Sequence, residues 1–126
     1  MQPRLDLIGL TCRDLAASAR FYRRLGVDFP DPDGPHLEAT LAGGLRFALD
    51  DQALMSELGM PEPAPHGRLG IAFLCEDVDA TYAELLKNGA TPHKEPWDAF
   101  WGQRYAQVYD PDGVIVDLFA PLAPSA

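Results

Sequence analysis

Side chains that could bind a metal ion or transfer protons lie at two places in the chain. His36 and Glu38 are separated by one residue, and Asp117 lies much nearer the end. Imidazole nitrogens and carboxylate oxygens bind divalent transition metals, and the same groups act as general acids and bases. These residues therefore indicate a metal site, metal-free acid–base chemistry or a hydrogen-bonded polar surface. Arg46 either forms an ion pair with Glu38 or Asp50, or binds an anionic group.

Aromatic residues and an amide offer a second kind of chemistry, the binding of a flat organic molecule. Trp97 and Trp101 lie on either side of the segment DAF, in a predicted loop, and Tyr105 follows. Such rings stack on ligands and attract cations, but Trp residues in a loop also pack at subunit interfaces or against the end of a core. Gln107 either bonds to Asp117 across a strand pair or binds an amine or amide of a ligand.

A repeat at half the length of the chain indicates how these side chains are positioned. The segment TCRDLA at 11–16 matches LCEDVD, which lies 63 positions later. Asp14 and Asp77 are typical residues for a helix N-cap, and Gly26 and Gly89 are typical of the position just after a helix. The repeat predicts two copies of one βαβββ module, which must pair because neither copy alone covers both faces of its sheet.

The predicted fold class is therefore α+β, with two paired βαβββ modules that form a concave mixed sheet around a ligand cavity. A single domain spans residues 1–126, with module 1 at about 4–50, a linker at about 51–67 and module 2 at about 68–121. Module 1 is predicted to contain strands at 4–12, 36–42 and 45–50, a short extended piece at 27–30 and a helix after Asp14. Module 2 is predicted to contain strands at 68–75, 102–109 and 114–119, an extended piece at 90–94 and a helix after Asp77. The linker includes a possible helical turn.

Alternation along the predicted strands sorts their side chains between two faces of each sheet. A type I turn in DPDG, with Gly113 in the left-handed conformation, places Gln107 opposite Asp117. Tyr105 and Phe119 then share the open face with this pair. In module 1, His36, Glu38 and Arg46 share the corresponding face, and Leu7 of the first strand points the same way. The opposite faces are apolar and suit a covering helix.

Composition and charge exclude some classes of function. The chain has 126 residues and a net charge of −9, which argues against nucleic acid as a partner. The same charge is compatible with a cationic ligand or with solubility alone. No apolar run is long enough for a signal peptide or a membrane span, so a cytoplasmic protein is expected. Cys12 and Cys75 are expected to be reduced core residues rather than a bridge or a metal pair.

The segments RDLAASARFYRRLGV, EDVDATYAELLKNGA and WGQRYAQVYDPDGVIVDLF resemble the vicinal oxygen chelate superfamily over nearly the whole chain. This superfamily includes glyoxalase I, extradiol dioxygenases, fosfomycin resistance enzymes and bleomycin resistance proteins. The resemblance implies paired modules around a ligand site, and commonly a homodimer.

The resemblance also implies four positions for a divalent ion, which fall on Leu7, Ala48, Gly70 and Asp117 in this sequence. Asp117 is the one residue of the four that could be a ligand. A divalent ion cannot be held by one carboxylate with Leu, Ala and Gly in the other places. We therefore expect no metal at this site and no cofactor.

Two functions remain open. The first is a metal-independent binding protein, similar to bleomycin resistance proteins, that sequesters a cationic or aromatic antibiotic or metabolite. The alternative is a glyoxalase-like lyase or isomerase, or a dioxygenase, with a shifted metal site or acid–base residues such as His36, Glu38 or Asp117. No catalytic residue is assigned. The predicted ligand-binding residues are Tyr105, Trp101, Gln107, Asp117, Phe119, His36, Glu38, Arg46, Trp97 and Leu7.

Overall fold

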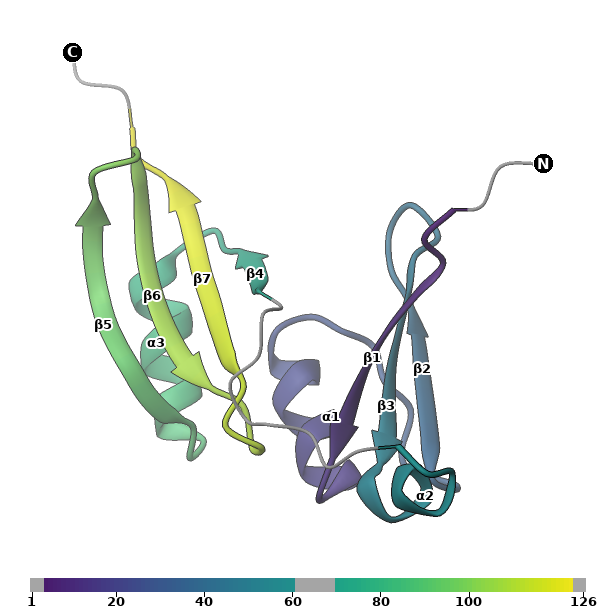
Figure 1. Ribbon diagram of the computed structural model, residues 1–126. Coiled ribbons are helices and arrows are strands. Elements are labelled where there is room, and N and C mark those ends of the chain that lie inside the picture. Colours follow the sequence, from purple (N-terminus) through teal and green to yellow (C-terminus); the bar gives the residue numbers. More distant parts are fainter. Residues whose placement is uncertain (1–3, 61–69, 124–126) are drawn as a thin grey trace. The chain divides into compact units, whose positions relative to one another are not determined.

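The computed structural model describes residues 4–60 and 70–123. The chain divides into two compact units, Met1–Ala64 and Pro65–Ala126, and each is described here by itself. The first unit contains β1 (Leu7–Cys12), α1 (Leu15–Arg24), β2 (His36–Thr40), β3 (Arg46–Asp51) and α2 (Gln52–Glu57) (Figure 1). The second unit contains β4 (Ile71–Leu74), α3 (Val78–Lys87), β5 (Thr91–Ala99), β6 (Gln103–Tyr109) and β7 (Ile115–Pro121).

Both units repeat one pattern of strand pairing. The strand order is β1-β3-β2 in the first sheet and β4-β7-β6-β5 in the second. In each unit the leading strand runs parallel to the last strand, and the hairpin partner is antiparallel. This arrangement confirms the α+β class and the repeated module. The last part of the predicted linker, at 61–67, lies outside the described residues, and its first part forms α2.

Both long helices begin and end where the repeat predicts. The carboxylate of Asp14 accepts a hydrogen bond from the backbone N–H of Ala17, and that of Asp77 accepts one from Ala80. Gly26 and Gly89 follow the helices at φ of 88° and 95°, a left-handed conformation that glycine adopts without a steric penalty.

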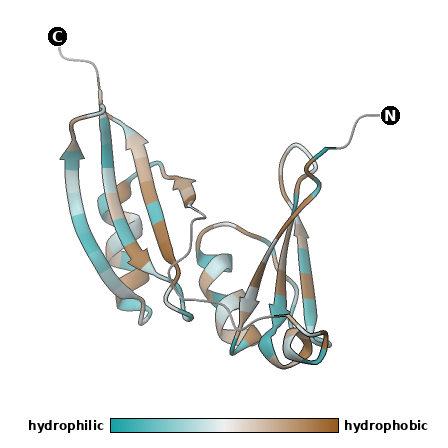
Figure 2. Ribbon diagram, viewed as in Figure 1, coloured by the Kyte–Doolittle hydropathy of each residue, from teal (hydrophilic) through white to brown (hydrophobic). Residues whose placement is uncertain are grey.

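The covered faces of the sheets match the predicted alternation. In the second unit, Ala106, Val108, Val116 and Leu118 are fully buried, and α3 contacts β5, β6 and β7. In the first unit, Leu37, Phe47 and Leu49 are buried with Tyr22 of α1. Figure 2 shows β5 coloured as hydrophilic along much of its length, whereas β7 is largely hydrophobic. Among the described residues, no helix has the length and hydropathy needed to cross a membrane.

Two details of the predicted strands are wrong. Residues 27–30 do not pair with the first sheet, because local bonds engage their backbone: Val27 N–H donates to Tyr22, and Phe29 C=O accepts from Arg23. The side chains of Val27 and Phe29 are buried in the core instead. The extended piece predicted at 90–94 is a nine-residue strand that continues through Trp97 to Ala99, so Trp97 does not lie in a loop.

Candidate functional site

Asp117 lies at the centre of the open face of the second sheet. Strand register places Gln107 opposite Asp117 and Tyr105 opposite Phe119, and Gly113 has a φ of 87° in the connecting turn, as predicted. The Tyr105 hydroxyl donates to Asp117 Oδ2 at 2.6 Å, and Gln107 Nε2 donates to Oδ1 at 2.8 Å. Each carboxylate oxygen therefore has a protein donor. Of the two possibilities for Gln107, the structure has the bond to Asp117.

The hydroxyl of Tyr105 is held in its protonated form. Partial burial disfavours the phenolate and raises the pKa of Tyr105 to about 12, and the adjacent Asp117 carboxylate acts in the same direction. Tyr105 is therefore a neutral hydrogen-bond donor across the physiological pH range. Its hydrogen bond orients the Asp117 carboxylate.

Aromatic rings surround Tyr105 on this face. The centroid of the Tyr105 ring lies 5.4 Å from that of Trp97 and 5.3 Å from that of Trp101, and its ring stacks on Phe119 at 6.5 Å. Trp101 is 48% exposed, and its indole N–H donates to the Gln103 side chain at 2.9 Å. This hydrogen bond and the ring contacts hold Trp101 in a defined orientation, so its exposed surface is available to a flat ligand.

A β-bulge between Lys94 and Trp97 in β5 brings these two side chains onto the same face. Lys94 pairs with Gln107 and Trp97 pairs with Tyr105, so β5 uses one residue more than β6 between these two pairs. The Lys94 ammonium lies 4.0 Å from the centroid of the Trp97 ring. Lys94 and Trp97 are three residues apart, so on a regular strand their side chains would point to opposite faces. Sequence reasoning therefore missed Lys94. Pro92 and Pro96 were the available signal, since proline within a sheet is favoured at bulges.

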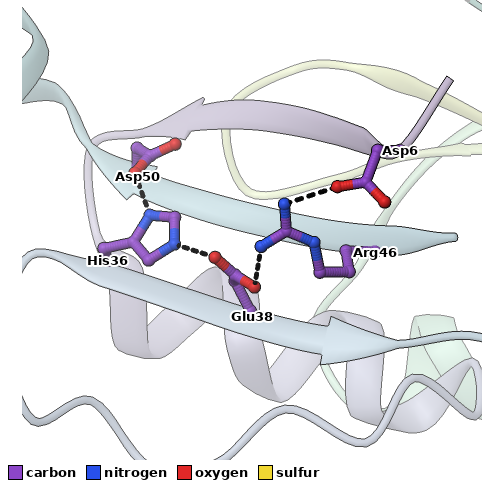
Figure 3. Close-up of polar contacts among 5 residues, drawn as sticks. All are labelled: Asp6, His36, Glu38, Arg46 and Asp50. Atoms are coloured by element: carbon purple, nitrogen blue, oxygen red, sulfur yellow. Dashed lines mark hydrogen bonds and ion pairs between the residues drawn. The ribbon is translucent and has the colours of Figure 1, made fainter. Parts of the chain in front are cut away.

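The open face of the first sheet carries a chain of ion pairs (Figure 3). Arg46 donates to Glu38 at 2.8 Å and to Asp6 at 2.7 Å. His36 Nε2 lies 2.7 Å from Glu38, and His36 Nδ1 contacts Asp50. The structure therefore has the predicted ion pair of Arg46 with Glu38, and His36 and Glu38 belong to a hydrogen-bonded polar surface. Asp6, which was not predicted, joins the chain because it precedes Leu7, and Leu7 pairs with Arg46 in the parallel register.

The charge of His36 is expected to persist above its ordinary pKa of about 6.5. Hydrogen bonds to Asp50 and then to Glu38 raise the pKa of His36. Because the folded-state pKa exceeds the unfolded-state pKa, the resulting stabilisation is fully present below the unfolded-state value and is lost as the pH rises through the folded-state value. NMR titration of the imidazole should therefore give a raised midpoint, and Glu38→Gln should lower it. Asp31→Asn, which removes the carboxylate paired with Arg23, should leave it unchanged. A midpoint at or below the ordinary value would contradict this network.

The side chains at the four metal-binding positions do not fit a divalent ion. Gly9 and Ala72 are equivalent positions of the repeat. Gly9 pairs with Ala48 in the first unit and Ala72 pairs with Asp117 in the second, so Ala48 corresponds to Asp117. Leu7 and Gly70 have no side-chain donor atom at the other two positions, so Asp117 is the one carboxylate among the four. Within the part of the chain that the structure describes, no group of three or more His, Cys, Asp or Glu side chains is arranged to hold a metal.

Comparison with known proteins gives a family model and several structural relatives. The model of the glyoxalase/bleomycin resistance protein/dioxygenase superfamily matches residues 4–118. A protein of Mycolicibacterium smegmatis described as uncharacterized is 29% identical over 118 residues, which cover 94% of each chain. A glyoxalase-related enzyme from Fulvimarina pelagi superposes with a TM-score of 0.80 at 22% identity, over 94% of this chain and 88% of that one. A glyoxalase/bleomycin resistance protein/dioxygenase from Nocardioides gives 0.71 at 25% identity, over 99% and 87%.

Proposed function

Because the chain belongs to the glyoxalase/bleomycin resistance protein/dioxygenase superfamily, we propose that it is a metal-independent member that binds and sequesters a small aromatic or cationic molecule. The ligand lies on the open face of the second sheet. Its flat part stacks on the rings of Trp97, Trp101 and Tyr105, and an amine or amide of the ligand bonds to Asp117.

One observation carries this proposal: Asp117 is engaged by two protein donors and is bordered by aromatic rings. A divalent ion needs several donor side chains, and Leu7, Ala48 and Gly70 supply none in addition to Asp117. Asp117 is oriented by Tyr105 and Gln107, and each of its oxygens keeps a second lone pair for a ligand N–H beside the stacking surfaces. Such a group suits the cationic or N–H end of an organic molecule. The net charge of −9 also favours a cationic ligand group.

Elemental analysis of protein purified without chelator tests metal independence. We expect no stoichiometric divalent ion, and no increase in melting temperature on addition of Ni²⁺, Zn²⁺, Mn²⁺ or Fe²⁺, since a ligand that binds the folded state alone must stabilise it. One ion per chain with a clear stabilisation would contradict the proposal and favour a metal-dependent lyase or dioxygenase. Loss of that stabilisation in Asp117→Asn, but not in the surface variant Glu84→Gln, would assign the ion to Asp117.

A further inference from the structure

Lys94 places a positive charge on the proposed binding face. The register puts Lys94, Gln107 and Asp117 in one row across β5, β6 and β7. Neighbouring strands are about 4.8 Å apart, so the two ends of this row are separated by roughly 10 Å at the backbone. The Lys94 side chain extends along β5, because its ammonium lies over the ring of Trp97, a residue of the same strand. The row therefore presents a cation and an anion on either side of a neutral amide.

The position of the Lys94 ammonium affects which ligands can use Trp97. It lies 4.0 Å from the ring centroid, where a cation is attracted by the negative π face. A cationic group of a ligand would have to displace Lys94 from this place or approach it against like-charge repulsion. An anionic group that lies next to Trp97 would instead form an ion pair with Lys94.

We infer that the ligand is an aromatic zwitterion, with an anionic group at Lys94, a cationic or N–H group at Asp117 and its ring against Trp97, Trp101 and Tyr105. This inference rests on the proposed function and narrows its ligand class. It differs from what the net charge of −9 indicates, because that charge repels anions at long range. At physiological salt the repulsion is screened over about 8 Å, so the contact with Lys94 dominates once the ligand is bound.

Three probes that share the indole ring system and differ in charge test the inference. L-Tryptophan is zwitterionic, indole-3-propionate is anionic and tryptamine is cationic. Binding is measured from amide chemical shifts of β5, β6 and β7 in the full chain. We expect tryptophan to bind tightest and tryptamine about fivefold more weakly, which is the size of effect that a partly exposed ion pair supplies.

The variant Lys94→Met removes the charge and keeps an unbranched side chain on Trp97. It should weaken the binding of tryptophan and indole-3-propionate by about fivefold and leave tryptamine equal or tighter. Lys87→Met is the matched control, because Lys87 is an exposed lysine of α3, on the other face of the sheet; it should change none of the three.

Two results would overturn the inference, and they are distinguishable. If tryptamine binds tightest, or if Lys94→Met leaves the affinities for tryptophan and indole-3-propionate unchanged, the zwitterion assignment fails while the binding face stands. If none of the probes shifts the resonances of β5, β6 and β7, the proposed function fails, and the inference fails with it.

Discussion

Leu118→Ala should lower the free energy of unfolding by about 3 kcal/mol, because it removes a fully buried side chain and leaves a cavity in a packed core. Phe119→Ala, at the next position of β7, should lower it by about 1 kcal/mol, since this half-buried ring lies on the open face. Denaturant unfolding followed by circular dichroism measures both values. Because Leu118 and Phe119 are adjacent on β7, the two variants allow the two faces of one strand to be compared.

The relative loss of stability in the two variants tests whether the face that carries the candidate site is an open surface or a buried core. If Phe119→Ala destabilised the protein as much as Leu118→Ala, the face that carries Asp117 would be a buried core rather than a binding surface. Such a result would remove the basis of the proposed function, whatever the metal content. We expect the larger loss of stability in Leu118→Ala because Leu118 pairs with Ala106 on the covered face, whereas Phe119 pairs with Tyr105 on the open face.

The local signals in the sequence were sufficient to predict much of the fold. Asp14 and Asp77 satisfy backbone donors within their own first helical turn, so these caps depend on nearby residues alone. The DPDG turn fixes its own register, and that register places Gln107 opposite Asp117 without further information. That placement left open whether Gln107 bonds to Asp117 or to a ligand, and the structure has the first.

The parts of the site that were missed depend on how one strand pairs with another. The bulge between Lys94 and Trp97 arises from the pairing of β5 with β6, and it places on one face two side chains that a regular strand would direct to opposite faces. Asp6 reaches Arg46 through the parallel pairing of β1 with β3, across 40 positions of sequence. Pro92 and Pro96 indicate that β5 is irregular, but neither segment alone gives the register, because a register is a property of two strands.

Trp101→Ala should weaken the binding of the tightest of the three indole probes by an amount on the order of 1–3 kcal/mol, which is typical of a lost aromatic anchor. Trp101 lies in the turn before β6, half-exposed, with its ring 5.3 Å from that of Tyr105. Its orientation is set by the bond to Gln103, so little ordering is required when a ligand stacks on it. Chemical-shift titration of the variant measures the change.

Phe100→Ala is the matched control for this experiment, because Phe100 is the adjacent aromatic residue and is 96% exposed. Its ring contacts Trp101 at 5.0 Å. We expect this variant to bind the probe nearly as the parent does, since a ring that is almost fully exposed provides one weak surface. Equal losses in both variants would assign the effect to the turn as a whole rather than to Trp101. Unchanged probe binding in Trp101→Ala, together with a change of molecular mass in light scattering, would instead place Trp101 at a subunit interface, the alternative that its sequence position left open.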